Sequence, residues 1–187
     1  MRKHTKEMEE YIKENLRYDP ETGHLWWIKP SENGVRTTRN LNKPVGTLHP
    51  AGYFRIKILS TNMSCHRTAW FLYYGHWPKE FLDHINGVKT DNRVENLRLA
   101  SNQENQMNSK KQIGSSSKYK GVYWDNERKK WSSGIEINQV RKRLGRYVLE
   151  EDAARAYDKA ARELFGDYAR LNFPDEHEQG ALNGHDL

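Results

Sequence analysis

Four polar residues in the segment 83–105 could together hydrolyse a phosphodiester. Asp83 and His84 are adjacent, Asn96 lies twelve positions after His84, and Asn105 lies nine positions after Asn96. The reaction needs a base that activates water and a cation that stabilises the charge developing on the phosphate. His84 suits the base, because a histidine with an unperturbed pKa of about 6.5 is neutral at physiological pH.

The other three side chains could supply cation ligands and support for the base. Asp83 can ligate through its carboxylate and Asn105 through its amide oxygen, and such hard oxygen donors suit Mg²⁺. With one formal charge in this set, we expect the ion to bind weakly alone and more tightly once a substrate phosphate adds oxygens. A side-chain amide opposite a histidine can fix the ring's orientation and tautomer, and we assign this role to Asn96.

Strand and helix signals surround these residues. The apolar run FLDH ends at His84, an Asn-Gly turn follows, and NLRLA can return as a second strand. Ser101 and Glu104 form a capping box, which predicts a helix beginning at Ser101. The segment should therefore fold as strand, loop, strand and helix, with Asn105 in the first helical turn.

The motif residues and their spacing resemble the HNH motif, in the form of phage homing endonucleases that has Asn in place of the last His. The resemblance implies a ββα-metal finger around one divalent ion, Mg²⁺ or Mn²⁺. It also implies that His84 is the general base, Asp83 and Asn105 are metal ligands, and Asn96 orients the base. In looser form it extends upstream through YDPETGHLWW, GYFRIKI and CHRTAWFLYYG, over roughly residues 16–110.

The upstream elements are predicted as scaffold. Apolar spacing indicates a short amphipathic helix in residues 1–16, alternating runs indicate an irregular antiparallel sheet over 25–58, and 66–75 should be a helix. Three aromatic residues of that helix share one face: Trp70, Phe71 and Tyr74. His66 could approach the site but is interpreted as structural, and His76 as a turn residue.

A second unit follows the polar stretch SKKQIGSSSK, which has no apolar period and is predicted to be a flexible linker. Three strand-like runs, GVYW, WSSGIEI and KRLGRYV, precede a helix that should end at Gly166. One buried stripe is expected on this helix: Ala153, Tyr157, Ala161 and Leu164. The acidic tail after Pro174 is expected to be loose.

Positive charge is concentrated in this second unit. Residues 109–147 contain eleven Lys and Arg against three acidic residues, so their net charge exceeds the +6 of the whole chain. The residues YKGVYW, KKW, KRLGRY, EDAARAYDKAA and ARLNFP resemble the plant ethylene-response-factor (APETALA-type) DNA-binding domain, over about residues 117–174. A basic open face of a small sheet fits the major groove of DNA.

Six side chains are predicted to bind DNA: Lys120, Tyr123, Lys130, Arg141, Arg143 and Arg146. Lys120 and Arg141 match basic contact positions of the resembled family. Tyr123 and Arg143 instead stand where plant members usually have arginine and tryptophan contacts. We therefore expect DNA binding without the plant recognition sequence, and we expect Trp124 and Trp131 to belong to the core.

Composition favours two small domains over one large one. Of the 187 residues 35% are hydrophobic and the mean hydropathy is −1.04, so one large core is not expected. The predicted fold class is α+β: a ββα-metal nuclease domain, then a small three-stranded antiparallel sheet packed on one helix. The expected bounds are 1–110 for the nuclease domain, 111–117 for the linker, 118–174 for the DNA-binding domain and 175–187 for the tail.

These features together predict a metal-dependent endonuclease that cuts double-stranded DNA, of phage or mobile-element type and targeted by its C-terminal domain. Two alternatives stay open. One is a sequence-specific DNA-binding regulator with a non-catalytic finger. The other is an RNA-binding accessory protein that would prefer single strands through aromatic stacking.

The remaining composition restricts the cellular setting. Cys65 is the single cysteine, which excludes a disulfide within the chain and cysteine-rich zinc sites. A charged N-terminus and the absence of an apolar run of about 18 residues predict a soluble, cytoplasmic protein with no membrane partner. The oligomeric state is not predicted.

Overall fold

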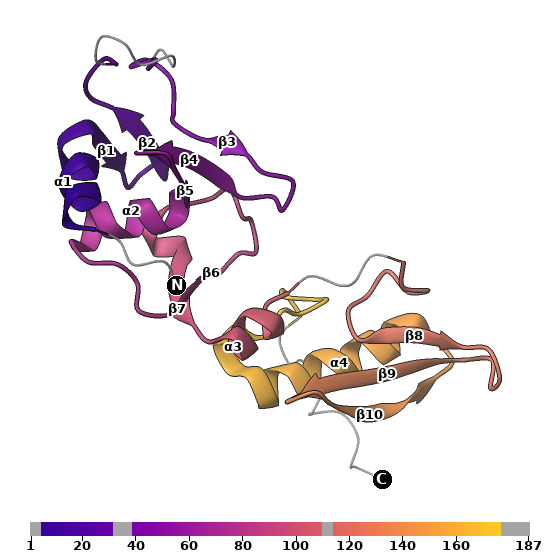
Figure 1. Ribbon diagram of the computed structural model, residues 1–187. Helices are drawn as coiled ribbons and strands as arrows, with labels where there is room; N and C mark the ends of the chain where they lie inside the picture. Colours follow the sequence, from indigo (N-terminus) through magenta and orange to yellow (C-terminus); the bar gives the residue numbers. More distant parts are fainter. Residues whose placement is uncertain (1–4, 32–38, 110–113, 177–187) are drawn as a thin grey trace. The chain divides into compact units, whose positions relative to one another are not determined.

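The structure is a computed structural model that describes residues 5–31, 39–109 and 114–176 (Figure 1). Contacts divide the chain into two compact units, residues 1–101 and 102–187. Each unit mixes helices with small antiparallel sheets. The division lies nine residues before the expected end of the nuclease domain at 110. Compact units are not functional domains, and the sequence-based domain bounds therefore stay predictions.

The first unit begins with a helix and two small sheets. Thr5 starts helix α1 (Lys6–Asn15), because its hydroxyl accepts a hydrogen bond of 3.2 Å from the Met8 amide. Strands β1 (Leu16–Asp19) and β2 (His24–Trp27) form an antiparallel hairpin. A three-stranded antiparallel sheet follows, in the order β3 (Thr47–Leu48), β4 (Phe54–Ile58) and β5 (Thr61–Ser64).

A helix and a second hairpin complete this unit. Helix α2 (Cys65–Tyr74) ends at Gly75, which takes the left-handed conformation with φ 77°. Strand β6 (Phe81–His84) pairs with β7 (Leu97–Ala100), and the short 3₁₀ helix η1 (Val94–Asn96) lies between them. The expected helix and both expected strands are thus confirmed. Of the three aromatic residues expected on one face of α2, Trp70 and Phe71 are buried and Tyr74 is 45% exposed.

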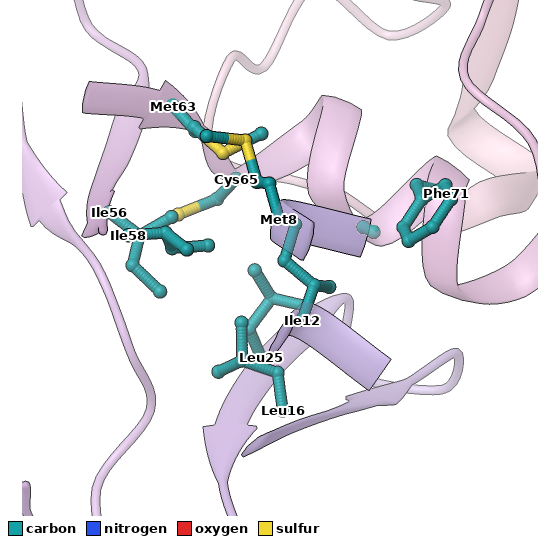
Figure 2. Packing of buried hydrophobic residues seen from close by; sticks show 10 residues of the cluster. Met8, Ile12, Leu16, Leu25, Ile56, Ile58, Met63, Cys65 and Phe71 are labelled. Carbon is teal, nitrogen blue, oxygen red and sulfur yellow. The ribbon is translucent and has the colours of Figure 1, made fainter. Parts of the chain in front are cut away.

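The core of the first unit joins all its early elements. Figure 2 shows side chains from α1, the β1–β2 hairpin, the three-stranded sheet and α2 meeting in one apolar cluster. Ile12 and Ile58 are completely buried, and Leu25 and Phe71 are 1% exposed. Small sheets cannot bury their faces alone, so this shared core fixes the hairpin and α2 relative to one another.

The second unit is a three-stranded sheet with a helix on one face (Figure 1). The short helix α3 (Asn102–Met107) comes first, directly after Ser101 as the capping box predicted. Strand β9 (Lys130–Ile137) lies between β8 (Val122–Asp125) and β10 (Val140–Tyr147), antiparallel to both. Helix α4 (Glu150–Phe165) and the 3₁₀ helix η2 (Gly166–Tyr168) follow.

Helix α4 packs through a stripe of small residues and aromatic rings. Ala153, Tyr157 and Ala161 are buried as predicted, and Gly166 ends the helix. The prediction for Leu164 is wrong, because Leu164 is 43% exposed and its neighbour Phe165 is buried. Among the described residues, no helix combines the length and apolar composition that a membrane span requires.

Part of the expected linker is bound to the second unit. The Ser115 hydroxyl donates to the Val122 carbonyl at 3.3 Å, and the Ser117 hydroxyl donates to the Glu150 carboxylate at 2.6 Å. Ser117 is therefore buried at the start of α4. Residues 110–113 of the linker, and the tail from 177, lie outside the described residues.

Gly121 provides a test of the packing in this unit. Its φ is 76°, and a Cβ at this position would lie 2.0 Å from Cδ2 of Tyr157 on α4. We predict that Gly121→Ala destabilises the second unit by roughly 2–4 kcal/mol, from overpacking and from the left-handed backbone. Differential scanning calorimetry would measure the shift of its unfolding transition.

Gly114→Ala is the matched control. Gly114 has φ 88°, and no heavy atom of the described residues would lie within 4 Å of its added Cβ. This variant should lose only the backbone contribution, about 1–2 kcal/mol. Equal losses in the two variants would contradict the proposed packing of Tyr157 against Gly121.

Candidate active site

Asp83 and His84 are the last two residues of strand β6. Successive side chains of a strand point to opposite faces, so these two groups lie on different sides of the β6–β7 hairpin. Asp83 pairs across the hairpin with Arg98, and His84 pairs with Leu97. Both polar groups are buried, at 8% and 3% exposure.

The His84 ring packs among aromatic side chains from two other elements. The ring of His66, in the first turn of α2, meets it edge to face with a centroid distance of 5.2 Å. The Tyr53 ring lies 5.8 Å from His84 and 5.3 Å from His66. His66 therefore approaches the site, a position that the sequence-based interpretation allowed while favouring a structural role.

A hydrogen bond to Asn92 determines the tautomer of His84. Nε2 of His84 lies 3.2 Å from Oδ1 of Asn92, in the loop between β6 and η1. An amide oxygen can only accept, so Nε2 must carry the proton. In the neutral ring Nδ1 is then the nitrogen with the lone pair, and it is the atom that can accept a proton from water.

Burial keeps both histidines neutral. Desolvation lowers the pKa of His84 below its ordinary value, a change that the Asn92 hydrogen bond and the charges of Asp83 and Asp91 oppose. Desolvation, with the neighbouring His84, lowers the pKa of His66 to about 3. Neutral imidazole is the form a general base needs, so His84 can act across the physiological pH range.

Asn96 holds the loop that follows His84. Its Oδ1 accepts from the Asn86 amide at 2.9 Å, and its Nδ2 donates to the Asp91 carbonyl at 2.8 Å. Asp91 in turn accepts from Asn86 Nδ2 and from the Arg93 guanidinium. These bonds act on the loop backbone, while the Nε2 bond of His84 goes to Asn92. The predicted role of Asn96 in orienting the ring directly stays a prediction.

Asp83 forms an ion pair within the hairpin. Nη2 and Nε of Arg98 lie 2.8 and 3.0 Å from Oδ2 of Asp83. A carboxylate with only 8% exposure needs such a partner, because an unpaired buried charge is strongly destabilising. The pair therefore fixes the orientation of Asp83, the predicted metal ligand.

Asn105 lies in α3, which belongs to the second compact unit, whereas Asp83, His84 and Asn96 belong to the first. The strands and helix expected for the motif are present in the expected order. Asp83 and His84 lie on opposite faces of the β6–β7 hairpin, and Asn96 lies in the segment that connects its two strands. Whether Asn105 joins them stays a prediction.

The second unit brings five of the six predicted DNA-binding residues to one face. The strand register and the alternation of side chains place Tyr123, Lys130, Arg141, Arg143 and Arg146 opposite the face that packs on α4. The Arg141 guanidinium lies 4.4 Å from the centroid of the Tyr123 ring. Gly134 lies between them on β9, and its missing side chain leaves the space that Arg141 crosses.

Lys120 departs from the predicted set. Its ammonium donates to the Met107 carbonyl and lies 5.9 Å from the centroid of the Tyr157 ring, away from the open face. Burial lowers the pKa of Lys120 to about 8. Lys120 therefore joins α3 to the sheet domain, and its predicted contact with DNA stays a prediction.

Comparisons with known proteins agree with this geometry. A model of the HNH endonuclease family matches residues 64–107, from the start of α2 to the end of α3. Protein 3.8 of Escherichia phage T7 is 33% identical over 107 residues, 57% of this chain and 88% of that protein. The chain belongs to the HNH endonuclease family. It is therefore a nuclease, and HNH endonucleases generally use divalent metal ions.

Two further relatives are matched over smaller shares of their length. An uncharacterized HNH endonuclease of Acanthamoeba polyphaga mimivirus is 35% identical over 112 residues, 59% of this endonuclease and 57% of the mimivirus protein. An ethylene-responsive transcription factor of Arabidopsis thaliana is 49% identical over 63 residues, 32% of each chain. No solved structure matches the endonuclease.

The sequence-based analysis missed three residues of the endonuclease site, and two of them carried no usable sequence signal. Asn92 lies within TDN, where it looks like any other polar loop residue. Tyr53 is far from His84 along the chain, and only the packing of the three-stranded sheet brings it near. Arg98 could have been found, because a strand pairing that places it opposite Asp83 predicts an ion pair.

The hydrogen bond from His84 to Asn92 makes a pH-dependent prediction for the metal-free endonuclease. In Asn92→Asp a carboxylate replaces a neutral amide and stabilises the imidazolium, so the pKa of His84 should rise by about one to three pH units. The wild-type ring should titrate below about 6.5, because burial lowers its pKa. NMR titration of the histidine ring signals would measure both values.

Asn62→Asp is the control for the added charge, because Asn62 is exposed on β5. It should leave the pKa of His84 close to the wild-type value. The assignment of Asn92 as the partner of Nε2 would be wrong if Asn92→Asp also left that pKa unchanged.

Proposed function

We propose that this endonuclease is of the homing type carried by phages and mobile elements, and that it hydrolyses double-stranded DNA with a divalent cation. The observation that carries the proposal is the buried His84 of the motif, with Nε2 bonded to Asn92 so that Nδ1 can accept a proton. Relatives in a phage and in a mimivirus support the setting.

In the proposed reaction, Nδ1 of His84 removes a proton from a water molecule as the water oxygen attacks phosphorus. A bond from oxygen to phosphorus forms, and the bond from phosphorus to one sugar oxygen breaks. The ring becomes an imidazolium until it releases the proton. Asn92 holds Nε2–H throughout, and Asn96 keeps the loop that carries Asn92 closed.

The donor set fits a hard divalent cation. Asp83 offers a carboxylate and Asn105 an amide oxygen, and we propose that these two residues hold Mg²⁺ or Mn²⁺. Among the described residues, no three His, Cys, Asp or Glu side chains gather into a metal cluster. When bound, the cation supplies stabilisation of the charge on the phosphate and the leaving oxygen.

The open face of the second unit is proposed to bind duplex DNA. Arg141, Arg143 and Lys130 are exposed on this face, and Arg146 is half-buried beside Asp125 at 3.1 Å. Stacking on Tyr123 restricts the Arg141 guanidinium before any DNA arrives, which reduces the entropy lost on binding. The sheet would tether the nuclease near its site and raise the local concentration of target.

His84→Ala should lower the cleavage rate by about 10²–10⁴-fold, the usual contribution of a general base, with DNA affinity nearly unchanged. Affinity should persist because phosphate contacts provide most of it. Relaxation of supercoiled plasmid with Mg²⁺, and with EDTA in its place, would measure the rate and the metal requirement together.

His76→Ala is the matched control, because His76 is an exposed histidine in the bend after α2. It should cut at the wild-type rate. Full cleavage by His84→Ala, or equal cleavage by the wild-type protein in EDTA, would remove the proposed mechanism.

Arg141→Ala should weaken DNA binding through the sheet. If Arg141 touches a phosphate, the slope of log K against log salt should become less negative by about 0.9. If it reads a guanine edge, discrimination at one base pair should fall by about 1–3 kcal/mol instead. Binding would be measured with the His84→Ala protein, which retains the sheet and does not consume its substrate.

Lys142→Ala is the control for lost charge. Lys142 is an exposed neighbour on β10 that pairs with Ile135, on the other face of the sheet. It should change binding less than Arg141→Ala. Identical salt dependence in the two variants would show that the open face is not the DNA-binding surface.

A further inference from the structure

The β1–β2 hairpin contacts the loop that holds the His84 ring. The Tyr18 hydroxyl, on β1, donates to the Asn92 carbonyl at 2.9 Å and accepts from the Val94 amide at 3.0 Å. These two bonds join residues more than seventy positions apart. The hairpin lies outside the segment that matches the nuclease family model, residues 64–107.

Gly23 makes a second contact with the same stretch of loop. Its φ is 72°, and an added Cβ would lie 2.6 Å from the Arg93 nitrogen and 2.8 Å from the Asn92 carbonyl carbon. The turn that delivers Gly23 is itself organised by Asp19, whose carboxylate accepts from the Glu21 amide and the Thr22 hydroxyl. The segment YDPETG thus forms a rigid surface against Asn92 and Arg93.

We propose that Tyr18 is a positioning residue for catalysis, which holds the Asn92 backbone so that the Asn92 amide keeps His84 in its Nε2–H tautomer. Two hydrogen bonds connect Tyr18 to the ring. The Tyr18 hydroxyl donates to the Asn92 carbonyl, and Asn92 Oδ1 accepts from His84 Nε2. Asn92 is 3% exposed, so a loosened carbonyl would lack water to replace the lost donor.

The hydroxyl is suited to a permanent structural role. Burial raises the pKa of Tyr18 to about 12, so the donor proton is present wherever the enzyme works. The edge-to-face contact of its ring with Tyr73, at 6.3 Å between centroids, fixes the ring as well. The effect on cleavage rests on the base role proposed for His84, whereas the effect on the tautomer does not.

Tyr18→Phe tests the proposal, because it keeps the ring and removes both hydrogen bonds. In the metal-free protein, long-range ¹H–¹⁵N NMR should show His84 as the Nε2–H tautomer in the wild type and as a tautomer mixture in the variant. Hydrogen exchange at the Val94 amide should accelerate. The single-turnover cleavage rate should fall by about 10- to 100-fold, as with other residues that support a catalytic group, at unchanged DNA affinity.

Tyr73→Phe is the matched control, since it removes a hydroxyl from the neighbouring exposed ring. It should leave the tautomer and the cleavage rate unchanged. Gly23→Ala provides a second variant. Its added Cβ should displace the backbone at Asn92 and Arg93, and it should change the His84 signals in the same direction as Tyr18→Phe.

Wild-type His84 signals and a wild-type rate in both Tyr18→Phe and Gly23→Ala would overturn the proposal. The proposed function fails in a different way. In that case His84→Ala would still cut DNA, while Tyr18→Phe would still alter the His84 tautomer.

Discussion

The hydrogen bond from His84 Nε2 to Asn92 Oδ1 is the constraint on which the rest of the site depends. A buried imidazole can accept a proton from water only if it is neutral and its lone pair sits on a known nitrogen. A neutral amide partner meets both needs, because it accepts from Nε2–H without stabilising the charged ring as strongly as a carboxylate would. His84, the proposed base, therefore stays neutral at physiological pH, and the surrounding fold must control the geometry of Asn92.

The surroundings pair the acidic groups near the His84 ring with arginines and keep the neighbouring histidine neutral. Asp83 is paired with Arg98 and Asp91 with Arg93, and hydrogen bonds from Arg93 hold the pKa of Asp91 at about 2. His66 stays neutral against the His84 ring, so the two imidazoles pack without repelling each other. The loop can then hold several polar groups at low exposure, because each has a partner inside the first unit.

Sequence patterns predicted the elements well and the long-range contacts poorly. The strands around His84 and the helix α4 follow local periodicity, which a single sequence records directly. Tyr18 contacts Asn92 across 74 positions of the chain, and no local spacing reports such a contact. Asn92 lies eight positions from His84, but its residue type does not distinguish it from other polar loop residues. The place of Lys120 could not be predicted for a related reason, since a match to a family position gives the residue type but not the α3 carbonyl that its ammonium binds here. The predicted burial of Leu164 was wrong by one helical position, because Phe165 is the residue that packs against the sheet at the end of α4.

Helix α3 carries a residue of the nuclease motif and also packs within the second unit. It carries Asn105 of the nuclease motif, yet Met107 packs with Ile135 and Tyr157 in the sheet domain, and the Lys120 ammonium binds its last carbonyl. Removing the sheet domain would therefore take away the packing partners of a motif residue as well as the basic face. Loss of cleavage in such a truncation would not by itself demonstrate loss of DNA targeting. Single substitutions on the open face leave α3 and its contacts intact. They would therefore test the proposed DNA binding without disturbing the helix that carries Asn105.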